Sequence, residues 1–297
     1  MNDQFDNTLK HQPVMTKEVL AQLITDKSGT YIDGTIGLGG HAKLILSTLN
    51  GTGHLIGIDK DQSALQIANK NLSKIGQNFS LFHDSYSNID SILERFNSQD
   101  VNGILLDLGL SSAQLGDRKR GFSFNGDGTL DMRFDQTSGT SAEEILDNSS
   151  ETEIAEFIKL YSEERFAQKI AYNIKKADKM STVGDLREAI RKSTHPNKRN
   201  RSFARVFQAI RIRVNEELHQ LEIFLQKFIN LLQIGGRIVI LSYHSLEDRM
   251  VKHSFRTLKQ NRQLTIINKK PLLPTKKEVL ENSRAQSAKL RAAEKIG

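Results

Sequence analysis

Three acidic residues stand where predicted β-strands end, and each could bind a charged or hydroxylated ligand. Asp33, Asp59 and Asp107 each follow a short apolar run. Between the first two lies the glycine-rich segment Gly37–Ala42, whose backbone N–H groups and following helix N-terminus could approach a nucleoside cofactor. Asp59 lies about twenty residues past that loop, where a carboxylate can accept hydrogen bonds from both ribose hydroxyls. These residue types and spacings predict a nucleoside cofactor site.

The identity of the cofactor depends on what surrounds the glycines. Gly37-Leu-Gly-Gly-His-Ala42 satisfies the loose dinucleotide pattern G-x-G-x-x-A, and a tight turn without a ligand is the alternative. A Walker loop is excluded, because Gly-His follows Gly39 in place of Lys and Ser or Thr. Asp33 would repel a pyrophosphate but would attract a cationic amino-acid group. Asp107 could form the wall that fixes a sulfonium. The pattern favours S-adenosylmethionine, with a nicotinamide oxidoreductase as the rival interpretation.

Apolar runs and helical patterns alternate along the chain and predict a doubly wound α/β domain. Strands are expected within 31–33 and 55–59 and over 79–83, 103–107 and 236–242, with helices over 62–74, 89–96 and 215–232. From residue 141 to 190 the apolar residues fall at helical spacing, which predicts an all-helical domain inserted into the sheet domain. The expected boundaries are 1–115 for the first part of the sheet domain, 116–214 for the insertion and 215–297 for the second part. Residues 287–295 are expected to form a loosely held tail.

Composition limits the class of protein and its partners. The chain has 297 residues and no cysteine, which excludes disulfides and thiolate zinc sites and fits a reducing cytoplasm. No apolar run approaches the roughly 18 residues of a membrane span, and the first residues do not resemble a secretory signal. A net charge of +7 suggests a polyanionic partner, particularly because basic residues concentrate between Lys192 and Arg213. A solvated helix face is the alternative for that stretch.

Several long motifs occur in the order that one known family has. They are Asp107-Leu-Gly-Leu-Ser-Ser-Ala-Gln-Leu115, Arg120-Gly-Phe-Ser-Phe124, Leu130-Asp-Met-Arg133, Arg205-Val-Phe-Gln-Ala-Ile-Arg211 and Ser242-Tyr-His-Ser-Leu-Glu-Asp-Arg249. With His11-Gln-Pro-Val and Ser287-Ala-Lys-Leu-Arg291, the chain closely resembles the bacterial 16S ribosomal RNA cytosine-N4 methyltransferases, the RsmH/MraW family. The resemblance covers nearly the whole chain.

The resemblance implies a class I S-adenosylmethionine-dependent methyltransferase fold with an inserted all-helical domain that recognises RNA. The implied reaction is methylation of the exocyclic N4 amine of a decoding-centre cytidine in 16S rRNA of the small ribosomal subunit. The residues that match the family's S-adenosylmethionine contacts are Gly39, Gly40, His41, Asp59, Tyr86, Asp107 and Gln114.

Three residues at predicted strand ends are candidates for the chemistry at the acceptor. Asp107 could accept a hydrogen bond from the cytosine amine, and Tyr243 could stack on an extruded base. His244 is expected to orient backbone or phosphate in preference to acting as a general base. The eight histidines show no metal-ligand spacing, so no metal is expected.

The predicted RNA grip depends on Lys198, Arg199 and Arg201, which would contact ribosomal RNA phosphates. A non-catalytic RNA-binding factor that keeps the fold is a third possible class. The sequence leaves open whether the protein is a monomer or a homodimer.

Overall fold

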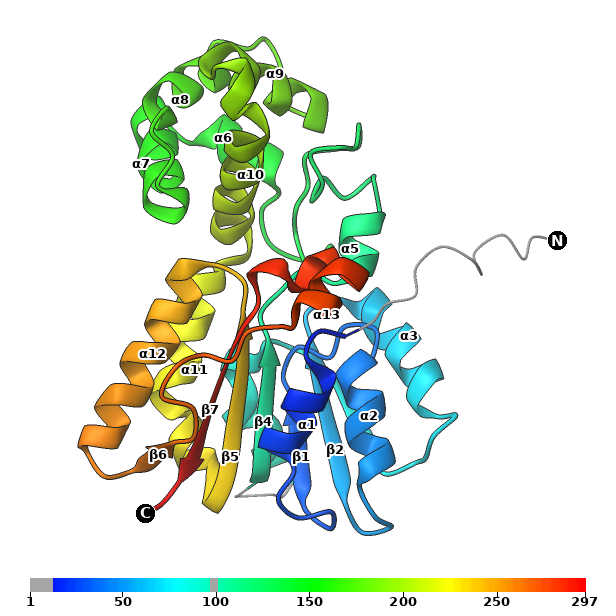
Figure 1. Ribbon diagram of the computed structural model, residues 1–297. Helices are drawn as coiled ribbons and strands as arrows, with labels where there is room; N and C mark the ends of the chain where they lie inside the picture. The colour runs from blue at the N-terminus through cyan, green and yellow to red at the C-terminus, as the bar shows by residue number, and fades with distance from the viewer. Residues whose placement is uncertain (1–12, 97–100) are drawn as a thin grey trace, which may run out of the picture. The chain divides into compact units, whose positions relative to one another are not determined.

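The computed structural model describes residues 13–96 and 101–297 (Figure 1). The chain divides into two compact units. The sheet unit comprises Met1–Gly109 and Leu218–Gly297, and the helical unit comprises Leu110–Glu217. The helical unit is longer at both ends than the expected insertion, 116–214. Its ends are part of it because Leu110 and Leu115 pack against its hydrophobic core, and because the Asn215 side-chain amide donates to the Met132 carbonyl at 2.8 Å.

One seven-stranded sheet forms the centre of the sheet unit, in the order β3-β2-β1-β4-β5-β7-β6. The strands β1 to β5 are parallel, and β7 runs antiparallel to both β5 and β6. The strand order reverses between β1 and β4, which is where such sheets bind ligands, at the carboxyl ends of the strands. The predicted doubly wound α/β fold is confirmed. The strands are β1 Thr30–Asp33, β2 His54–Asp59, β3 Phe79–His83, β4 Val101–Asp107, β5 Leu232–Ser242, β6 Leu264–Ile266 and β7 Lys289–Lys295.

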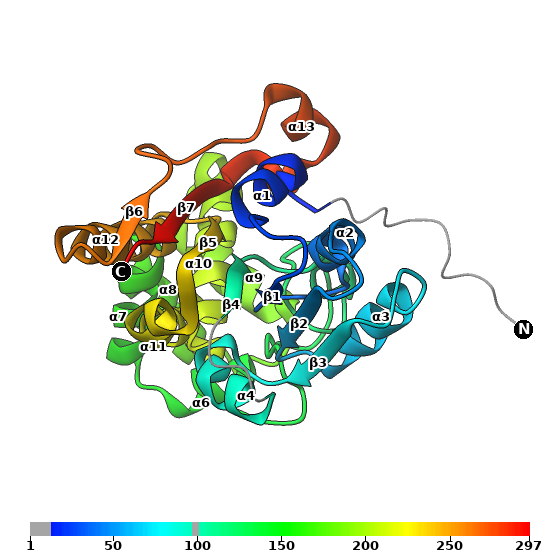
Figure 2. The ribbon, with the colours of Figure 1, turned by 90° about the horizontal axis from the view of Figure 1, so that it is seen from below.

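Helices cover both faces of this sheet, as the view along the strands shows (Figure 2). Alternate residues of each strand enter two separate cores: Tyr31 faces one and Ile32 the other. The first core packs α1, α2 and α3, and the second packs α4, α11 and α12. Coverage on both faces explains the continuous apolar sequence of β4, in which all residues but Asp107 are buried. The bounds are α1 Thr16–Leu23, α2 Gly40–Thr48, α3 Gln62–Leu72, α4 Ile89–Arg95, α11 Glu217–Leu231, α12 Ser245–Gln260 and α13 Lys276–Glu281, with 3-10 turns η1 Tyr86–Asn88 and η3 Ser283–Ser287.

The expectation of a loosely held C-terminal tail is wrong. Residues 289–295 form β7, which lies between β5 and β6 inside the sheet. Leu290, Ala292 and Ala293 are buried. Polar side chains of the strand are paired, with Arg291 Nε 2.7 Å from a carboxylate oxygen of Asp248. Small and charged residues gave this strand a weak sequence signal, yet it has neighbours on both sides.

The helical unit has a core of its own, built from helices with strong caps. Ser141, Ser150 and Thr182 each begin a helix with a reciprocal capping box. Phe122, Leu130 and the apolar faces of the helices form one buried cluster. Across residues 13–96 and 101–297, the structure contains no helix with the length and apolarity to cross a membrane. The helices are α5 Ser112–Gly116, α6 Ala142–Asn148, α7 Glu151–Ser162, α8 Ala167–Lys175, α9 Val183–Ser193 and α10 Arg199–Asn215, with the 3-10 turn η2 Pro196–Lys198.

Candidate functional site

The glycine-rich loop between β1 and α2 is held in shape by Asp59. Gly37 and Gly39 have positive φ angles of 51° and 85°, a conformation that suits glycine. The Gly37 N–H donates to Asp59 Oδ2 at 2.7 Å, and the Asp61 N–H donates to Asp59 Oδ1 at 2.9 Å. Asp59 therefore fixes the loop through its hydrogen bonds to backbone N–H groups.

A cavity of about 330 Å³ opens beside this loop, which is the size of pockets that bind small ligands. Gly39 and Gly40 line it together with Lys43 and Lys74. Gly40 begins α2, so its backbone N–H belongs to a helix N-terminus.

Burial raises the pKa of two acids at this edge of the sheet, Asp33 and Asp59. Asp33 is 1% exposed and accepts one hydrogen bond, from the Thr35 N–H at 3.2 Å. Burial raises the pKa of Asp33 from 3.8 to about 7, against the opposing effect of nearby His41. Burial likewise raises the pKa of Asp59 to about 6. A ligand that brings a positive charge and hydroxyl donors fits these acids better than an anion does.

Asp107 differs from the other two acids because it has strong local partners. The Tyr243 hydroxyl donates to its Oδ1 at 2.6 Å, and His41 Nε2 lies 3.6 Å from its Oδ2, an ion-pair distance longer than a hydrogen bond. Burial favours protonation, but His41, then Tyr243 and the charge of Arg284, hold the pKa of Asp107 below its ordinary value. At neutral pH Asp107 is therefore a carboxylate, suited to accept hydrogen bonds.

Tyr243 is fixed on two sides. Its hydroxyl is engaged by Asp107, and its ring lies against Gly109, where an added Cβ would come within 2.8 Å of the ring. Burial, then the negative charge of Asp107, raises the pKa of Tyr243 well above its ordinary value, so it remains a donor. A tyrosine held in this way is suited to positioning Asp107.

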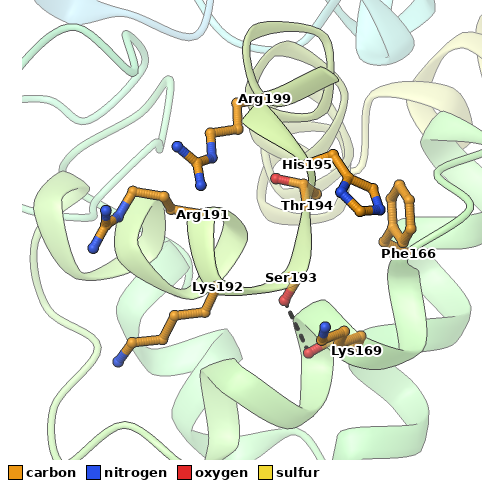
Figure 3. A pocket seen from close by; sticks show the side chains of 8 residues that line it. All are labelled: Phe166, Lys169, Arg191, Lys192, Ser193, Thr194, His195 and Arg199. Carbon is orange, nitrogen blue, oxygen red and sulfur yellow. Dashed lines mark hydrogen bonds between the residues drawn. The ribbon is translucent and has the colours of Figure 1, made fainter. Parts of the chain in front are cut away.

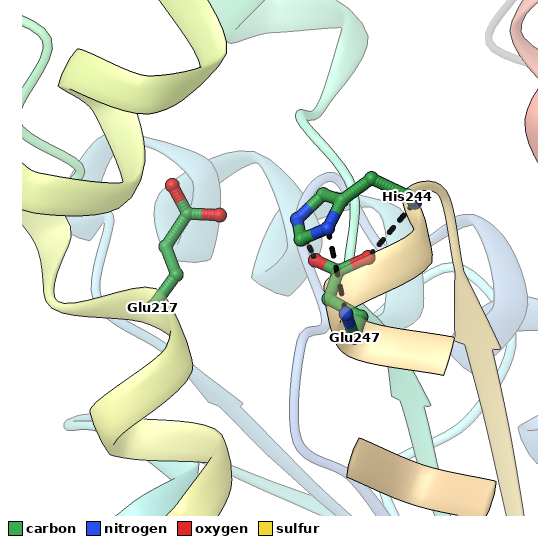
Figure 4. Close-up of side chains that lie close together, drawn as sticks. All are labelled: Glu217, His244 and Glu247. Carbon is green, nitrogen blue, oxygen red and sulfur yellow. Dashed lines mark hydrogen bonds and ion pairs between the residues drawn. The ribbon is translucent and has the colours of Figure 1, made fainter. Parts of the chain in front are cut away.

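His244 caps the helix that follows β5 (Figure 4). Its Nδ1 accepts the Glu247 N–H at 3.4 Å, and Glu247 Oε2 accepts the His244 N–H in return. Its Nε2 lies 3.1 Å from Glu247 Oε1 without hydrogen-bond geometry. Glu217, also drawn in Figure 4, belongs to the helical unit, where it pairs with Arg211 at 2.7 Å.

Tyr86 follows β3 and rests edge-on against Phe224, with ring centroids 5.7 Å apart. Hydroxyls on either side of it, Ser85 and Ser87, both donate to the Gln220 side-chain oxygen. This network fixes the turn that presents Tyr86. Tyr86 is thus rigidly placed in the sheet unit.

The remaining predicted residues lie in the helical unit. Gln114 forms a capping box with Ser111 at the start of α5. Lys198 and Arg201 are exposed, and Arg199 is partly buried at the start of α10. Three other cations of the same basic stretch are already paired: Arg211 with Glu217 at 2.7 Å, and Arg205 with Glu164 and Lys192 with Glu188, each at 3.9 Å.

Some residues that shape the site were not found from the sequence. Thr35 Oγ1 accepts the Asp107 N–H at 2.6 Å, and buried Glu247 accepts the Tyr243 N–H at 2.9 Å. Arg284 in η3 contributes positive charge to Asp107 and Tyr243. Thr35 follows the end of β1 by two residues and Glu247 lies in the first turn of the helix after β5, whereas Arg284 has no such position.

The seven-stranded sheet, with a glycine-rich turn after β1 and acids at the ends of β1, β2 and β4, has the architecture of a class I methyltransferase. The chain belongs to the MraW methylase family, whose model matches residues 8–296, and it is a methyltransferase. Ribosomal RNA small subunit methyltransferase H of Thermosipho africanus is 45% identical over 291 residues, covering 97% of this chain and 98% of the relative. The protein of the same name from Caldicellulosiruptor saccharolyticus is 40% identical, covering 97% and 99%. A solved rRNA methylase from Streptococcus thermophilus has 14% identity and a TM-score of 0.46, covering 98% of this chain and 100% of that one.

Proposed function

We propose that this methyltransferase transfers a methyl group from S-adenosyl-L-methionine to the exocyclic N4 amine of a decoding-centre cytidine in 16S rRNA of the small ribosomal subunit. The observation that carries the proposal is the carboxylate of Asp107, held ionised by His41 and Tyr243 at the same sheet edge as the glycine loop. The names of the relatives, small subunit rRNA methyltransferases, support the choice of RNA. The proposed compartment is the cytoplasm.

The cofactor would be held by residues from four strand ends. Gly40 offers a backbone N–H group at the start of α2, Gly39 lets the cofactor approach the loop closely, Asp59 accepts from the ribose hydroxyls, and Tyr86 contacts the adenine. His41 and Asp107 complete the set in the sheet unit, and the family resemblance adds Gln114. S-adenosylmethionine supplies a methyl group on a sulfonium, and the α-ammonium group of its amino-acid end would complement buried Asp33.

Asp107 would act on the acceptor. The N4 nitrogen is a poor nucleophile because its lone pair is delocalised into the cytosine ring. A carboxylate that accepts an N4–H hydrogen bond favours the pyramidal geometry of attack and stabilises the positive charge that develops on nitrogen. Tyr243 and His41 would keep that carboxylate ionised and oriented. His244 would act indirectly, through the backbone turn that it caps.

Lys198, Arg199 and Arg201 would hold the RNA through its phosphates. They are consecutive or nearly so at the start of α10, and no acidic residue interrupts them. Each phosphate contact adds affinity by counterion release.

The decisive experiment is tritiated methyl transfer to small ribosomal subunits that lack the modification, with naked 16S rRNA assayed beside them and the modified base mapped. We expect one methyl group on N4 of a single cytidine. Methylation of a different atom would contradict the proposed target, and absence of transfer with tight S-adenosylmethionine binding would contradict the proposed substrate. Calorimetry with NAD in place of S-adenosylmethionine should show no binding.

A further inference from the structure

A recess in the helical unit, which we call the α8–α10 recess, combines cationic and aromatic side chains (Figure 3). Its volume is about 450 Å³, within the range of pockets that bind small ligands. Lys169 from α8, Arg191 and Lys192 from the end of α9, and Arg199 from the start of α10 line it. Phe166 and His195 form its aromatic side.

The recess lies in the basic half of the helical unit. Residues 169–213 contain thirteen lysines and arginines but only three acids, whereas residues 110–168 contain six basic and twelve acidic residues. This uneven distribution of charge within one unit concentrates positive potential around the recess. Such a field attracts an anion and raises its local concentration.

Not all of the lining cations are available to a ligand. Glu188 holds Arg191 through two hydrogen bonds of 2.7 and 2.9 Å and lies 3.9 Å from Lys192. By contrast, the buried Nε of Arg199 has no hydrogen-bond partner within the described part of the chain. A buried donor without a partner is costly, and an anion in the recess would relieve that cost. Arg199, whose charge also acts on Glu188, therefore keeps a buried donor for a ligand.

The aromatic side is suited to a base. The His195 ring is exposed and meets Phe166 at 72°, with centroids 6.4 Å apart. In this edge-to-face arrangement a ring keeps a face open for stacking. The adjacent hydroxyls are used internally: Ser193 donates to Ala189 and Thr194 to Ile190, each at 2.8 Å. The groups that remain for a ligand are the lining cations and a face of the His195 ring. Cations bind phosphate, and an aromatic ring face stacks on an unstacked nucleobase.

We propose that the α8–α10 recess binds one unpaired nucleotide of the RNA substrate, with its phosphate on Lys169, Lys192 and Arg199 and its base stacked on His195. This inference rests on the proposed function for the identity of the RNA as 16S rRNA. The recess would therefore bind a base in addition to attracting a phosphate. Only a base that has left its stacked neighbours would reach the His195 ring. The recess would thereby recognise the shape of the RNA around the target.

The test measures the dissociation constant for 16S rRNA by filter binding over a range of salt concentrations. Lys169→Gln combined with Lys192→Gln should weaken binding and lower the slope of log Kd against log salt by up to about 0.7, because the phosphate loses two of the three cations that neutralise it. His195→Ala should weaken binding about fivefold or more, the low end for a stacked base, without changing the slope. The His195 side chain makes no capping bond to η2, so its removal should not unfold the unit.

A matched control carries the same change in charge elsewhere on the unit. Lys159→Gln combined with Lys179→Gln removes two exposed lysines that do not line the recess. The proposal would be overturned if the recess variants and the control had the same dissociation constant and salt slope. It would also be overturned if the His195→Ala variant bound RNA with wild-type affinity. S-adenosylmethionine affinity should be unchanged in every variant. Failure of the wild-type protein to methylate rRNA would contradict the proposed function, whereas these binding comparisons would still decide the role of the recess.

Discussion

At the scale of single residues, the hydrogen bond from Tyr243 acts with His41 to keep Asp107, the carboxylate proposed to accept the N4–H hydrogen bond, in its charged form. Tyr243→Phe removes the 2.6 Å donor and keeps the ring against Gly109. A hydrogen bond to a charged group contributes about 1.5–3 kcal/mol, so we expect kcat for methyl transfer to fall about tenfold or more. Because Tyr243 is one of the groups that lower the pKa of Asp107, the acid limb of the pH–kcat profile should move to higher pH in this variant.

Measured pH–rate profiles check this prediction. Tyr172→Phe, a change at a half-exposed tyrosine of the helical unit, is the control and should leave both kcat and the profile unchanged. An unshifted acid limb in Tyr243→Phe would show that the tyrosine does not set the charge of Asp107.

The pKa of Asp33 is raised, whereas that of Asp107 is lowered, and this shift leads to a prediction for stability. The folded-state pKa of Asp33, about 7, lies above its ordinary value of 3.8, so folding takes up a proton between these pH values. Stability of the ligand-free protein should therefore fall as pH rises through this window, by up to about 1.4 kcal/mol per pH unit. Asp33→Asn should flatten that dependence and raise the melting temperature at pH 8, while weakening S-adenosylmethionine binding. Thermal melts at several pH values, with calorimetry, measure both effects; an unchanged pH dependence would rule out Asp33 as its source.

At the scale of elements, His244 acts as the cap of α12. His244→Ala should cost about 0.5–2 kcal/mol of stability, whereas His244→Asn keeps a capping oxygen and should cost little. If the residue acts only through the cap, the Asn variant should retain methyl transfer close to wild type. Loss of activity in a stable His244→Asn protein would point to direct contact with the RNA.

The strand β7 supports a second prediction about elements. Leu290 is fully buried between neighbouring strands, and Leu290→Ala should cost about 2–5 kcal/mol in urea unfolding. Leu280→Ala, at a leucine that is 88% exposed, should change stability by less than about 0.5 kcal/mol. Equal effects would mean that residues 289–295 are loosely held after all.

These elements show what the sequence could reveal. Asp59 and Asp107 were predictable because each ends a continuous apolar run whose burial fixes it in a parallel strand. The Asp107–Tyr243 bond was not, since 136 residues separate the partners and the pairing of β4 with β5 brings them together. The strand β7 was missed because alanines and paired charges carry little strand propensity.

At the scale of the whole molecule, methyl transfer is proposed for the sheet unit and phosphate contact with RNA for the helical unit, and each unit has its own hydrophobic core. The sheet unit buries two clusters on the faces of one sheet, and the helical unit buries its own cluster of helices. Substitutions at distant sites without shared partners act independently. Changes in surface charge on the helical unit should accordingly leave the cofactor loop unaffected.

That separation makes the salt dependence of RNA binding the most direct test of the basic stretch at the start of α10. Neutralising Lys198, Arg199 and Arg201 together to Gln should weaken 16S rRNA binding and reduce the slope of log Kd against log salt by up to about 2, since each neutralised phosphate accounts for about 0.7. S-adenosylmethionine affinity should stay constant, because its proposed carboxylate contacts lie in the sheet unit. A control with the same charge change combines Lys159→Gln, Lys176→Gln and Lys179→Gln, all at exposed positions. Equal slopes in the two triple variants would mean that the net charge of +7 attracts RNA without specific phosphate contacts at the start of α10. Lys198, Arg199 and Arg201 would then form only a solvated helix face.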